Sequence, residues 1–263
     1  MSSLSVILIT LNEEENIVPC LESVRWADEI IVVDSQSTDR TAELARRFTE
    51  KIIISEWRGF SHNKKLALAQ ATCEWVLWID ADERVTPELR QEIQAVIARN
   101  PLQDGFEIAR KAYFLGRWIK HCGWYPGYVL RLFRRLKARF NDNLVHEGLE
   151  LDGPRGRLKH ALLHFTDNTL DHYLWKFNRY TSLAATELAQ KKRKSGFLTI
   201  FFRSLHAFVK MYVFKLGFLD GVQGLILCLL SANYVAMKYA KLWEIENISN
   251  LKLATTETEP TQK

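Results

Sequence analysis

The fold is decided by four short apolar runs: L-S-V-I-L-I-T at Leu4–Thr10, E-I-I-V-V-D at Glu29–Asp34, K-I-I-I-S at Lys51–Ser55 and W-V-L-W-I-D at Trp75–Asp80. Each run is rich in β-branched or aromatic residues and has the length of a strand, so each predicts a strand buried on both faces. Buried runs of this kind are typical of parallel sheets, whose two faces are both covered.

Helical segments separate these runs. The spacing predicts helices at Glu15–Val24, from Asp39 to about Phe48, and at Asn63–Ala71. Thr86 and Pro87 supply an N-cap and a first-turn proline for a fourth helix that runs to about Arg99. Strands that alternate with helices predict an α/β fold with a doubly wound, mainly parallel sheet. Ligands bind such sheets at the carboxyl ends of the strands, where Thr10, Asp34 and Asp80 fall.

The regular alternation stops near residue 100. Residues 101–165 hold only short apolar pieces, such as Phe106–Ala109 and Val129–Phe133, and predict a mixed acceptor half of the same domain. We therefore expect one α/β domain over 1–165, in which residues 1–100 form the alternating half and residues 101–165 the mixed half. Residues 166–245 are expected to form a helical, basic and aromatic region, and 246–263 a disordered tail rich in Thr, Glu and Lys.

Composition excludes several classes of protein. The chain has 263 residues, and its four cysteines (Cys20, Cys73, Cys122 and Cys228) are far apart, with no CxxC pair. This disfavours a zinc ribbon and a disulfide scaffold, and favours a reduced cytosolic compartment. The N-terminus has no basic region and only a short apolar run, so no signal peptide is expected.

The positive charge is concentrated in two segments. Nine basic residues and no acidic one lie in residues 110–139, and nine basic residues with only Asp220 lie in residues 191–241. The net charge is +5, so the rest of the chain carries −12. Both basic segments are also aromatic, which favours an anionic partner such as a phosphorylated glycan, an anionic lipid or a nucleic acid.

The C-terminal apolar segments resemble interfacial helices more than spanning ones. Phe197–Leu216 is interrupted by Arg203, Lys210 and other basic residues, and Gly217–Ala236 contains polar side chains. Basic residues interleaved with aromatic ones suit the headgroup region of an anionic membrane. We expect peripheral membrane association, with packing against each other or against a second subunit as the alternative.

Paired carboxylates follow the fourth strand. Asp80-Ala81-Asp82 places two carboxylates around one small residue, directly after an apolar run. Mg²⁺ and Mn²⁺ prefer such oxygens, and leave positions free for a diphosphate. The loops after the first two strands, which contain Thr10, Asn12 and Glu13 and then Asp34, are expected to contact a base and ribose. Neither GxGxxG nor GxxxxGK[ST] is present, which disfavours dinucleotide redox and P-loop chemistry.

Three ordered motifs resemble glycosyltransferase family 2, which has the GT-A fold. They are T-L-N-E-E-E-N from Thr10, V-V-D-S-Q-S-T-D from Val32 and W-I-D-A-D-E from Trp78. The resemblance covers about residues 4–100, although Ser35-Gln36-Ser37 stands where many members have a second Asp and a Gly. The segments Y-P-G-Y from Tyr125 and V-H-E from Val145, with His164, are similar to a narrower group: the lipopolysaccharide inner-core β-1,4-glucosyltransferases.

This resemblance implies an inverting transfer from a UDP-sugar, with UDP-glucose expected as the donor. It implies that Asp34 accepts from the uracil, that Thr10, Asn12 and Glu13 lie around the base and ribose, and that Lys64 or Lys65 assists the diphosphate. Asp80 would approach the ribose and a Mn²⁺ or Mg²⁺ ion, Asp82 would hold the metal, and His164 would be a third metal ligand or an ordinary core histidine.

An inverting displacement needs one base to take the proton from the acceptor hydroxyl. The candidate is Glu147, with His146 as a rival or an orienting partner. Arg131, Arg134 and Arg135 are expected to bind anionic groups of the acceptor, although alternation on a strand would point Arg131 and Arg134 to opposite faces.

The leading hypothesis is therefore a metal-dependent hexosyltransferase at the cytoplasmic face of the inner membrane, acting on a heptose of an anionic, lipid-linked glycan. Transfer to polyprenyl phosphate is the nearest alternative, and a nucleotidyltransferase is a second. A basic nucleic-acid-binding module is a third, but it leaves Asp34, Asp80 and Asp82 unexplained, so no nucleic-acid partner is expected. A homo-oligomer remains open.

Overall fold

The computed structural model describes residues 3–141, 148–167 and 169–256. It divides into two compact units. The first unit comprises residues 1–113 and 125–166, and the second comprises residues 114–124 and 167–263. The predicted boundary after residue 165 lies one residue from the boundary after residue 166. The sequence did not indicate that residues 114–124 belong with the helical region.

The first unit is built on a mixed sheet whose strands follow the order β3-β2-β1-β4-β8-β6-β11-β5. The strands from the alternating half of the sequence are β1 Leu4–Thr10, β2 Glu29–Asp34, β3 Ile52–Ile54 and β4 Trp75–Trp78. The others are β5 Glu83–Arg84, β6 Gly105–Phe114, β8 Gly127–Arg134 and β11 Arg155–Asp167. A separate antiparallel pair joins β9 Ala138–Phe140 to β10 Leu149–Leu151, beside a 3₁₀ turn at Arg135–Lys137.

The four strands predicted from the apolar runs are parallel to one another. β1 lies between β2 and β4, and all seven of its residues are buried. Thr10 is in register with Asp34, so the carboxyl ends of β1 and β2 coincide. β8 then pairs antiparallel with β4, and β6 antiparallel with β8. The predicted α/β fold, with a parallel first half and a mixed second half, is confirmed.

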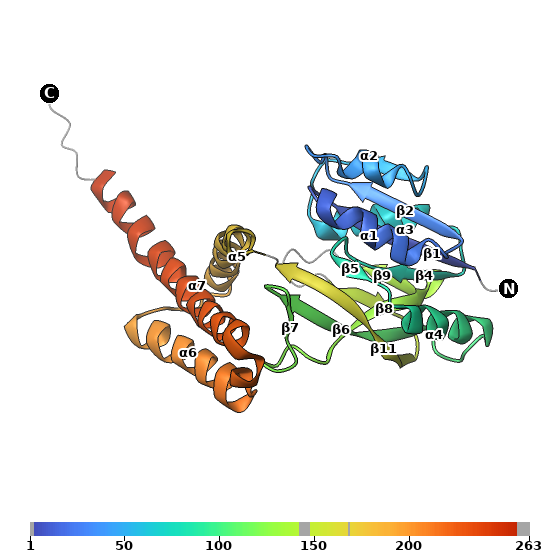
Figure 1. The fold of residues 1–263 in the computed structure, drawn as a ribbon. Helices are drawn as coiled ribbons and strands as arrows, with labels where there is room; N and C mark the ends of the chain where they lie inside the picture. The colour runs from blue at the N-terminus through green and yellow to red at the C-terminus, as the bar shows by residue number, and fades with distance from the viewer. Residues whose placement is uncertain (1–2, 142–147, 168, 257–263) are drawn as a thin grey trace, which may run out of the picture. The chain divides into compact units, whose positions relative to one another are not determined.

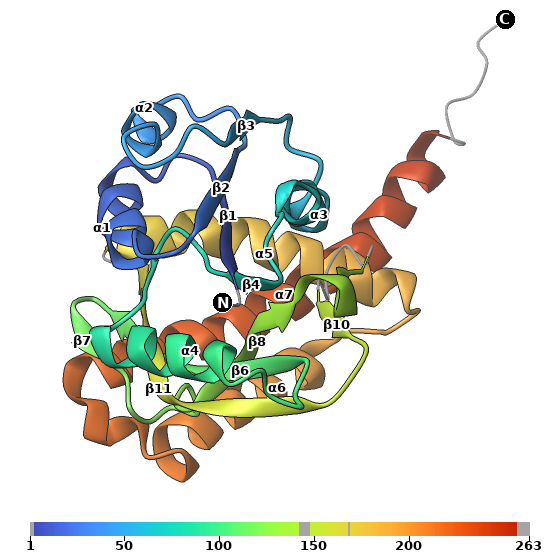
Figure 2. The same ribbon diagram turned by 90° about the vertical axis from the view of Figure 1, so that its right-hand side faces the viewer.

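Helices cover both faces of this sheet (Figure 2). Helices α1 Glu14–Val24, α2 Thr41–Ala45 and α4 Pro87–Ala98 pack on one face with residues such as Leu8 and Val32. Helix α3 Phe60–Gln70 packs on the other face with Ile7 and Ile31. Thr86 caps α4 by accepting from the Leu89 N–H at 3.2 Å, as the sequence predicts. Helix α2 is shorter than expected, and α3 begins three residues earlier than expected.

The second unit is helical (Figure 1). Its helices are α5 Leu170–Gln190, α6 Phe197–Val209 and α7 Gly221–Thr256, and its short strand is β7 Arg117–Trp118. A π-helical turn at Lys210–Phe214 and a 3₁₀ turn at Gly217–Asp220 connect α6 to α7. Helix α7 continues to Thr256 and thus enters the segment predicted as a disordered tail. Good helix formers such as Glu244, Glu246 and Leu251 favour this continuation.

Close packing at the α6–α7 connection explains why residue 217 is a glycine, which has no Cβ. A Cβ on Gly217 would lie 2.9 Å from the sulfurs of both Cys122 and Cys228. These two thiols are 3.6 Å apart and buried, although they are far apart in sequence. All four cysteines are buried and carry free thiols in this structure.

Two segments of the second unit are long and apolar enough to cross a membrane, judged by length and composition alone. They are Phe197–Phe214 and Gly217–Ile248. This differs from the sequence analysis, which found neither segment suited to spanning. The first of them has none of its residues buried inside the protein.

Candidate active site

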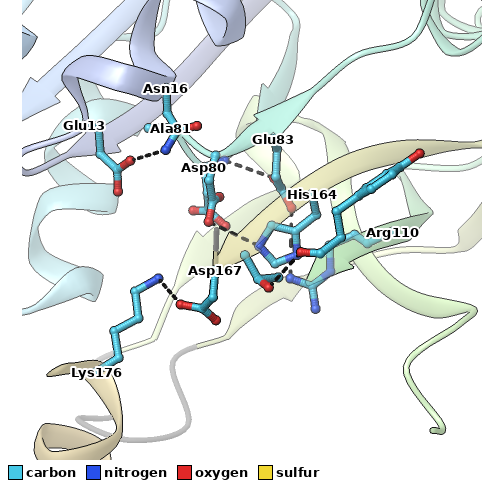
Figure 3. A network of polar contacts seen from close by, with 12 residues as sticks. Glu13, Asn16, Asp80, Ala81, Glu83, Arg110, His164, Asp167 and Lys176 are labelled. Atoms are coloured by element: carbon cyan, nitrogen blue, oxygen red, sulfur yellow. Dashed lines mark hydrogen bonds and ion pairs between the residues drawn. The ribbon is translucent and has the colours of Figure 1, made fainter. Parts of the chain in front are cut away.

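The turn after β4 carries the paired carboxylates. The backbone folds back over Asp80-Ala81-Asp82, because the Glu83 N–H donates to the Asp80 carbonyl at 3.0 Å. The Glu83 carboxylate in turn accepts from the Asp80 N–H at 3.0 Å, so side chain and backbone close the same turn (Figure 3). Glu83 is fully buried, whereas Asp80 and Asp82 are partly exposed. The turn thus presents the two aspartates, and Glu83 holds its shape.

Arg131, on β8, balances the charge of this turn. Its Nη2 lies 2.6 Å from Asp80 Oδ2 and 2.7 Å from Glu83 Oε1, and the residue is only 1% exposed. The guanidinium also stacks over the Trp78 ring, 4.1 Å from its centroid. The expectation that Arg131 binds an acceptor was wrong, because the side chain is buried and holds two carboxylates of its own chain.

The buried charges move two pKa values in opposite directions. Burial favours the neutral form of Asp80, but the Arg131 guanidinium outweighs it and lowers the pKa to about 2. Burial raises the pKa of Glu83, and the neighbouring Asp80 charge adds to the rise while Arg131 opposes it. Asp80 is therefore ionised at neutral pH, as a ligand for a cation or a ribose hydroxyl must be.

Strand β11 brings His164 to this turn. β11 pairs antiparallel with β5, with His164 opposite Glu83, and the Phe165 N–H donates to the Asp82 carbonyl at 2.9 Å. His164 Nε2 lies 3.4 Å from Asp82 Oδ2. The predicted approach of His164 to Asp82 is thus present, although the two residues are far apart in sequence.

These side chains fit a divalent cation in part. Asp82 Oδ1 is a buried oxygen with no hydrogen-bond partner among the described residues, and His164 offers a nitrogen beside it. Within the described ranges, however, no three His, Cys, Asp or Glu side chains form a ready set for a metal, since Asp80 turns to Arg131. One or two protein ligands completed by substrate phosphates are what Mg²⁺ commonly uses.

The ends of β1 and β2 form the predicted nucleotide side. Asp34 is 1% exposed and accepts from the Ser37 N–H at 2.9 Å and from the Ser37 hydroxyl at 2.5 Å. Thr10 lies beside it in register, and its buried hydroxyl has no hydrogen-bond partner in the described parts of the chain. Asp34 therefore shapes its own loop, and Thr10 keeps a free polar atom.

Asn12 and Glu13 tie the loop after β1 to the loop after β2. The Asn12 amide oxygen accepts from the Thr38 N–H at 2.8 Å, and the Glu13 N–H donates to the Thr41 hydroxyl at 2.8 Å. Asp39 accepts from the N–H groups of Thr41 and Glu14, and so holds the first residues of α2 and α1. Asp39 is not itself the N-cap of α2, however, because Arg40 occupies that position and the helix has no side-chain cap.

Lys64 is the lysine of α3 that enters the site. It is 8% exposed, and its Nζ lies 4.3 Å from the centroid of the Trp78 ring. Its charge assists Arg131 in lowering the pKa of Asp80 against the opposing effect of burial. Buried Asn63 donates to the Ser35 hydroxyl at 2.8 Å and fixes α3 against the loop after β2. Lys65 is less buried and lies in a separate pocket.

Three residues that sequence reasoning missed connect the loops. Asn16 donates to Glu13 at 2.9 Å (Figure 3). Asn16 also accepts from Arg84 Nη2 at 3.1 Å. Arg84 Nη1 also donates to the carbonyls of Ala81 and Glu83, both at 2.8 Å. Asn16 ends the motif that begins at Thr10, and Glu83 and Arg84 directly follow the aspartate pair, so motif membership was the available signal.

The other predicted residues do not belong to the contacts described above. Glu147 and His146, the candidate base and its rival, lie outside the described residues. Arg134 pairs with Glu74 and Asp104, and Arg135 Nε donates to the Cys73 carbonyl at 3.1 Å. Both arginines thus contact their own chain, and the acceptor role expected of them stays a prediction.

Comparison with known proteins was made after this geometry was established. Residues 5–147 match the family described as Glycosyl transferase family 2. The lipopolysaccharide core biosynthesis glycosyltransferase LpsC of Rhizobium meliloti (strain 1021) is 32% identical over 253 residues, which cover 92% of each chain. An uncharacterized glycosyltransferase of Rickettsia typhi is 26% identical over 257 residues, which cover 93% of this chain and 88% of that one.

Solved structures with a similar fold are more distant in sequence. The S. aureus TarS 1-349 structure in complex with UDP-GlcNAc has a TM-score of 0.46 and 17% identity, covering 95% of this chain and 92% of that one. Glucosyl-3-phosphoglycerate synthase from Mycobacterium tuberculosis, in complex with Mn²⁺, UDP and glucosyl-3-phosphoglycerate, has a TM-score of 0.47 and 19% identity, covering 74% and 82%.

Proposed function

The chain belongs to glycosyltransferase family 2, and on this premise we propose that it transfers a hexose, glucose from UDP-glucose, to a heptose of the lipopolysaccharide inner core. The observation that carries the acceptor class is the 32% identity to the lipopolysaccharide core enzyme, over 92% of both chains. The proposed place of action is the cytoplasmic face of the inner membrane, where a peripheral enzyme would meet a lipid-linked acceptor.

The donor would lie across the ends of β1, β2 and β4. The free Thr10 hydroxyl and the Asp34 carboxylate, with Asn12 and Glu13 in the same loops, are the groups that would recognise the base and ribose. Asp80 would contact the ribose, and Lys64 would place its positive charge near the diphosphate. Both side chains are already positioned by Trp78 and Arg131, so little ordering is needed when the donor binds.

Asp82 and His164 would hold a divalent cation, with Asp80 beside them. A Mn²⁺ or Mg²⁺ ion bound there supplies a Lewis acid that neutralises negative charge on the departing UDP. The orphaned Asp82 Oδ1 and the His164 nitrogen at 3.4 Å from Asp82 Oδ2 support this set. The Arg131 pair keeps Asp80 ionised before any cation arrives.

Inversion at the anomeric carbon follows from a single displacement. The acceptor hydroxyl attacks the carbon, the bond to the UDP oxygen breaks, and the hydroxyl proton passes to a base. Glu147 is the proposed base. In the sequence, Glu147 follows Phe140 by seven residues. Phe140, on β9, packs in the same core cluster as Trp78.

Transfer by the purified full-length protein tests this proposal. UDP-glucose, UDP-galactose and UDP-N-acetylglucosamine would be offered with Mn²⁺ or with chelator, and heptose-terminated lipopolysaccharide core would be the acceptor. We expect chelator-sensitive UDP release from UDP-glucose that rises with acceptor. Asp82→Asn should lower kcat by about 100-fold or more, since even supporting residues around a metal contribute about 10–100-fold. Glu147→Gln should lower it by about 10²–10⁴-fold.

Asp152→Asn is the matched control, because Asp152 is an exposed aspartate of the same unit. It should leave turnover within about twofold, as expected for a surface substitution remote from the site. Calorimetry of UDP binding with and without Mn²⁺ gives a second readout. If no donor is turned over and UDP does not bind, the transferase proposal is rejected. Turnover with polyprenyl phosphate but not with core heptose would reject the acceptor.

A further inference from the structure

The second unit contains a basic pocket that the transfer reaction does not use. It has a volume of about 380 Å³ and lies where the end of α5, the link that follows it, α6 and α7 meet. Its lining residues are Leu188, Arg193, Lys194, Thr199, Arg203 and Tyr239. We propose that this pocket binds the phosphate headgroup of an anionic membrane phospholipid.

The cations of the pocket have no acidic partners among the residues that the structure describes. Arg193, Lys194 and Arg203 form no ion pair with an acidic side chain in the part of the chain that the structure describes. Lys191, in the same link, differs, because its Nζ pairs with Glu187 four residues earlier. Three unpaired positive charges around one concavity repel each other, and an anion placed between them relieves that repulsion.

Aromatic and backbone groups complete the pocket. The Arg203 guanidinium stacks over the Tyr239 ring at 5.2 Å, which fixes one donor fork at the wall. Thr199 lies in the first turn of α6, a helix of 13 residues whose N-terminus has no side-chain cap. The free N–H groups of that turn add donors to those of the arginines. Arginine forks and backbone N–H groups are the donors that match phosphate oxygens.

The surface beside the pocket favours a lipid over a soluble phosphate. Helix α6 has no buried residue, and Phe197, Phe201 and Phe202 are between 50% and 77% exposed. Phe202 follows Thr199 by three residues and therefore lies on the pocket side of the helix. Phe197 and Phe201, which stack on each other, are two residues from Thr199 and Arg203 and extend the aromatic surface around the other side. An anionic phospholipid combines a phosphate with acyl chains, and so satisfies both surfaces at once.

The proposal of a lipid site depends on the proposed function only in placing the protein at a membrane. Its test measures vesicle binding and requires no sugar transfer. The full-length protein would be titrated with vesicles of phosphatidylcholine, and with vesicles that also contain phosphatidylglycerol. We expect tight binding to the second kind and weak binding to the first. Arg193→Gln/Arg203→Gln should weaken binding to the anionic vesicles by about 30-fold, since each basic residue at such a surface contributes about fivefold.

Lys191→Gln/Lys192→Gln is the matched control, since it removes two positive charges from the same link without touching the pocket lining. It should weaken binding by only about fivefold, because Lys191 is already paired with Glu187 and only Lys192 contributes a charge without an acidic partner among the described residues. Equal losses in the two double variants would assign binding to the general field of the unit and overturn the pocket. Millimolar inorganic phosphate that inhibits binding to the anionic vesicles as strongly as added lipid does would also overturn the proposal. A soluble anion would then be the ligand of the pocket.

If the glutamine variant fails to fold, Arg193→Lys/Arg203→Lys keeps the charge but removes the guanidinium forks. Weaker binding than in the native protein would support the site, and unchanged binding would contradict it. Transfer to a soluble core acceptor is measured in parallel. Retained turnover with lost vesicle binding supports the pocket, whereas absent turnover with retained vesicle binding rejects the proposed function and leaves the pocket standing.

Discussion

The two units of the molecule treat charge and apolar surface in opposite ways. The first unit buries its ions in pairs, as with Arg131 between Asp80 and Glu83, and covers every residue of β1. The second unit leaves Arg193 and Arg203 without acidic partners among the described residues and exposes Phe197 to 77%. The first unit therefore neutralises the buried charge of its turn within the chain, whereas the surface of the second is suited to a ligand outside the chain.

The largest expected effect comes from breaking the buried pair. Arg131→Met removes the nearest counter-charge of Asp80 and Glu83 and leaves only the more distant Lys64 and Arg110, so it should lower the free energy of unfolding by about 3–5 kcal/mol. Arg139→Met is the control, because Arg139 is 83% exposed and pairs with Glu150 at 2.9 Å. That surface pair should contribute only about 0–1 kcal/mol. Urea denaturation of the two variants measures both values.

Equal losses in these two variants would mean that Asp80 and Glu83 are not ionised beside Arg131. Protonation of the two carboxylates would remove the penalty, so the Arg131→Met protein should be less destabilised at pH 5 than at pH 8. A destabilisation that does not depend on pH would point instead to lost packing on Trp78.

The sequence was sufficient to predict the strands of the parallel half of the sheet. It was not sufficient to predict how the strands of the second half pair. β1 and β2 match their predicted bounds, because an unbroken β-branched run has one stable environment. β11, by contrast, mixes exposed and buried residues over 13 positions, and its partners are set by long-range contacts. His164 reaches Asp82 only through that pairing, so the family resemblance could suggest its place, whereas the residues around it could not.

The arginines show the same limit within the site. Alternation along β8 correctly separated Arg131 from Arg134, but it could not say which face was buried. Arg131 looked like an acceptor ligand because arginine is a common anion binder. In the folded chain its anions are Asp80 and Glu83, one of which was itself a predicted ligand. Partner identity depends on the packing of β8 against β4, which no local motif encodes.

A second prediction concerns the pH dependence of stability that the buried carboxylate of Glu29 causes. Glu29 is largely buried, which opposes ionisation. Hydrogen bonds from Lys51, Ser5 and Thr72 outweigh burial and lower its pKa from 4.5 to about 2. A depressed folded pKa gives stability that is present above the unfolded value and is lost as the pH falls through the folded value. Glu29 should therefore stabilise the native state fully above about pH 5 and progressively less between about pH 4.5 and 2.

Glu29→Gln should remove on the order of 2 kcal/mol at about pH 7 and much less at about pH 2.5. Thermal unfolding at several pH values gives the difference between the two proteins. Glu56→Gln, which removes a 70%-exposed carboxylate paired with Arg58, is the control and should change stability by under about 1 kcal/mol at either pH. A Glu29→Gln effect of equal size at both pH values would refute the link to ionisation.

The smallest expected effect lies on the exposed face of α6. Phe197 is 77% exposed, so Phe197→Ala should change the free energy of unfolding by no more than about 0.5 kcal/mol. Phe114→Ala, in the same unit, removes a fully buried ring and should destabilise by about 3–5 kcal/mol. Urea denaturation in detergent-free buffer compares them. If Phe197→Ala is as costly as Phe114→Ala, then α6 is covered by protein in solution, and its aromatic face is not available to a bilayer.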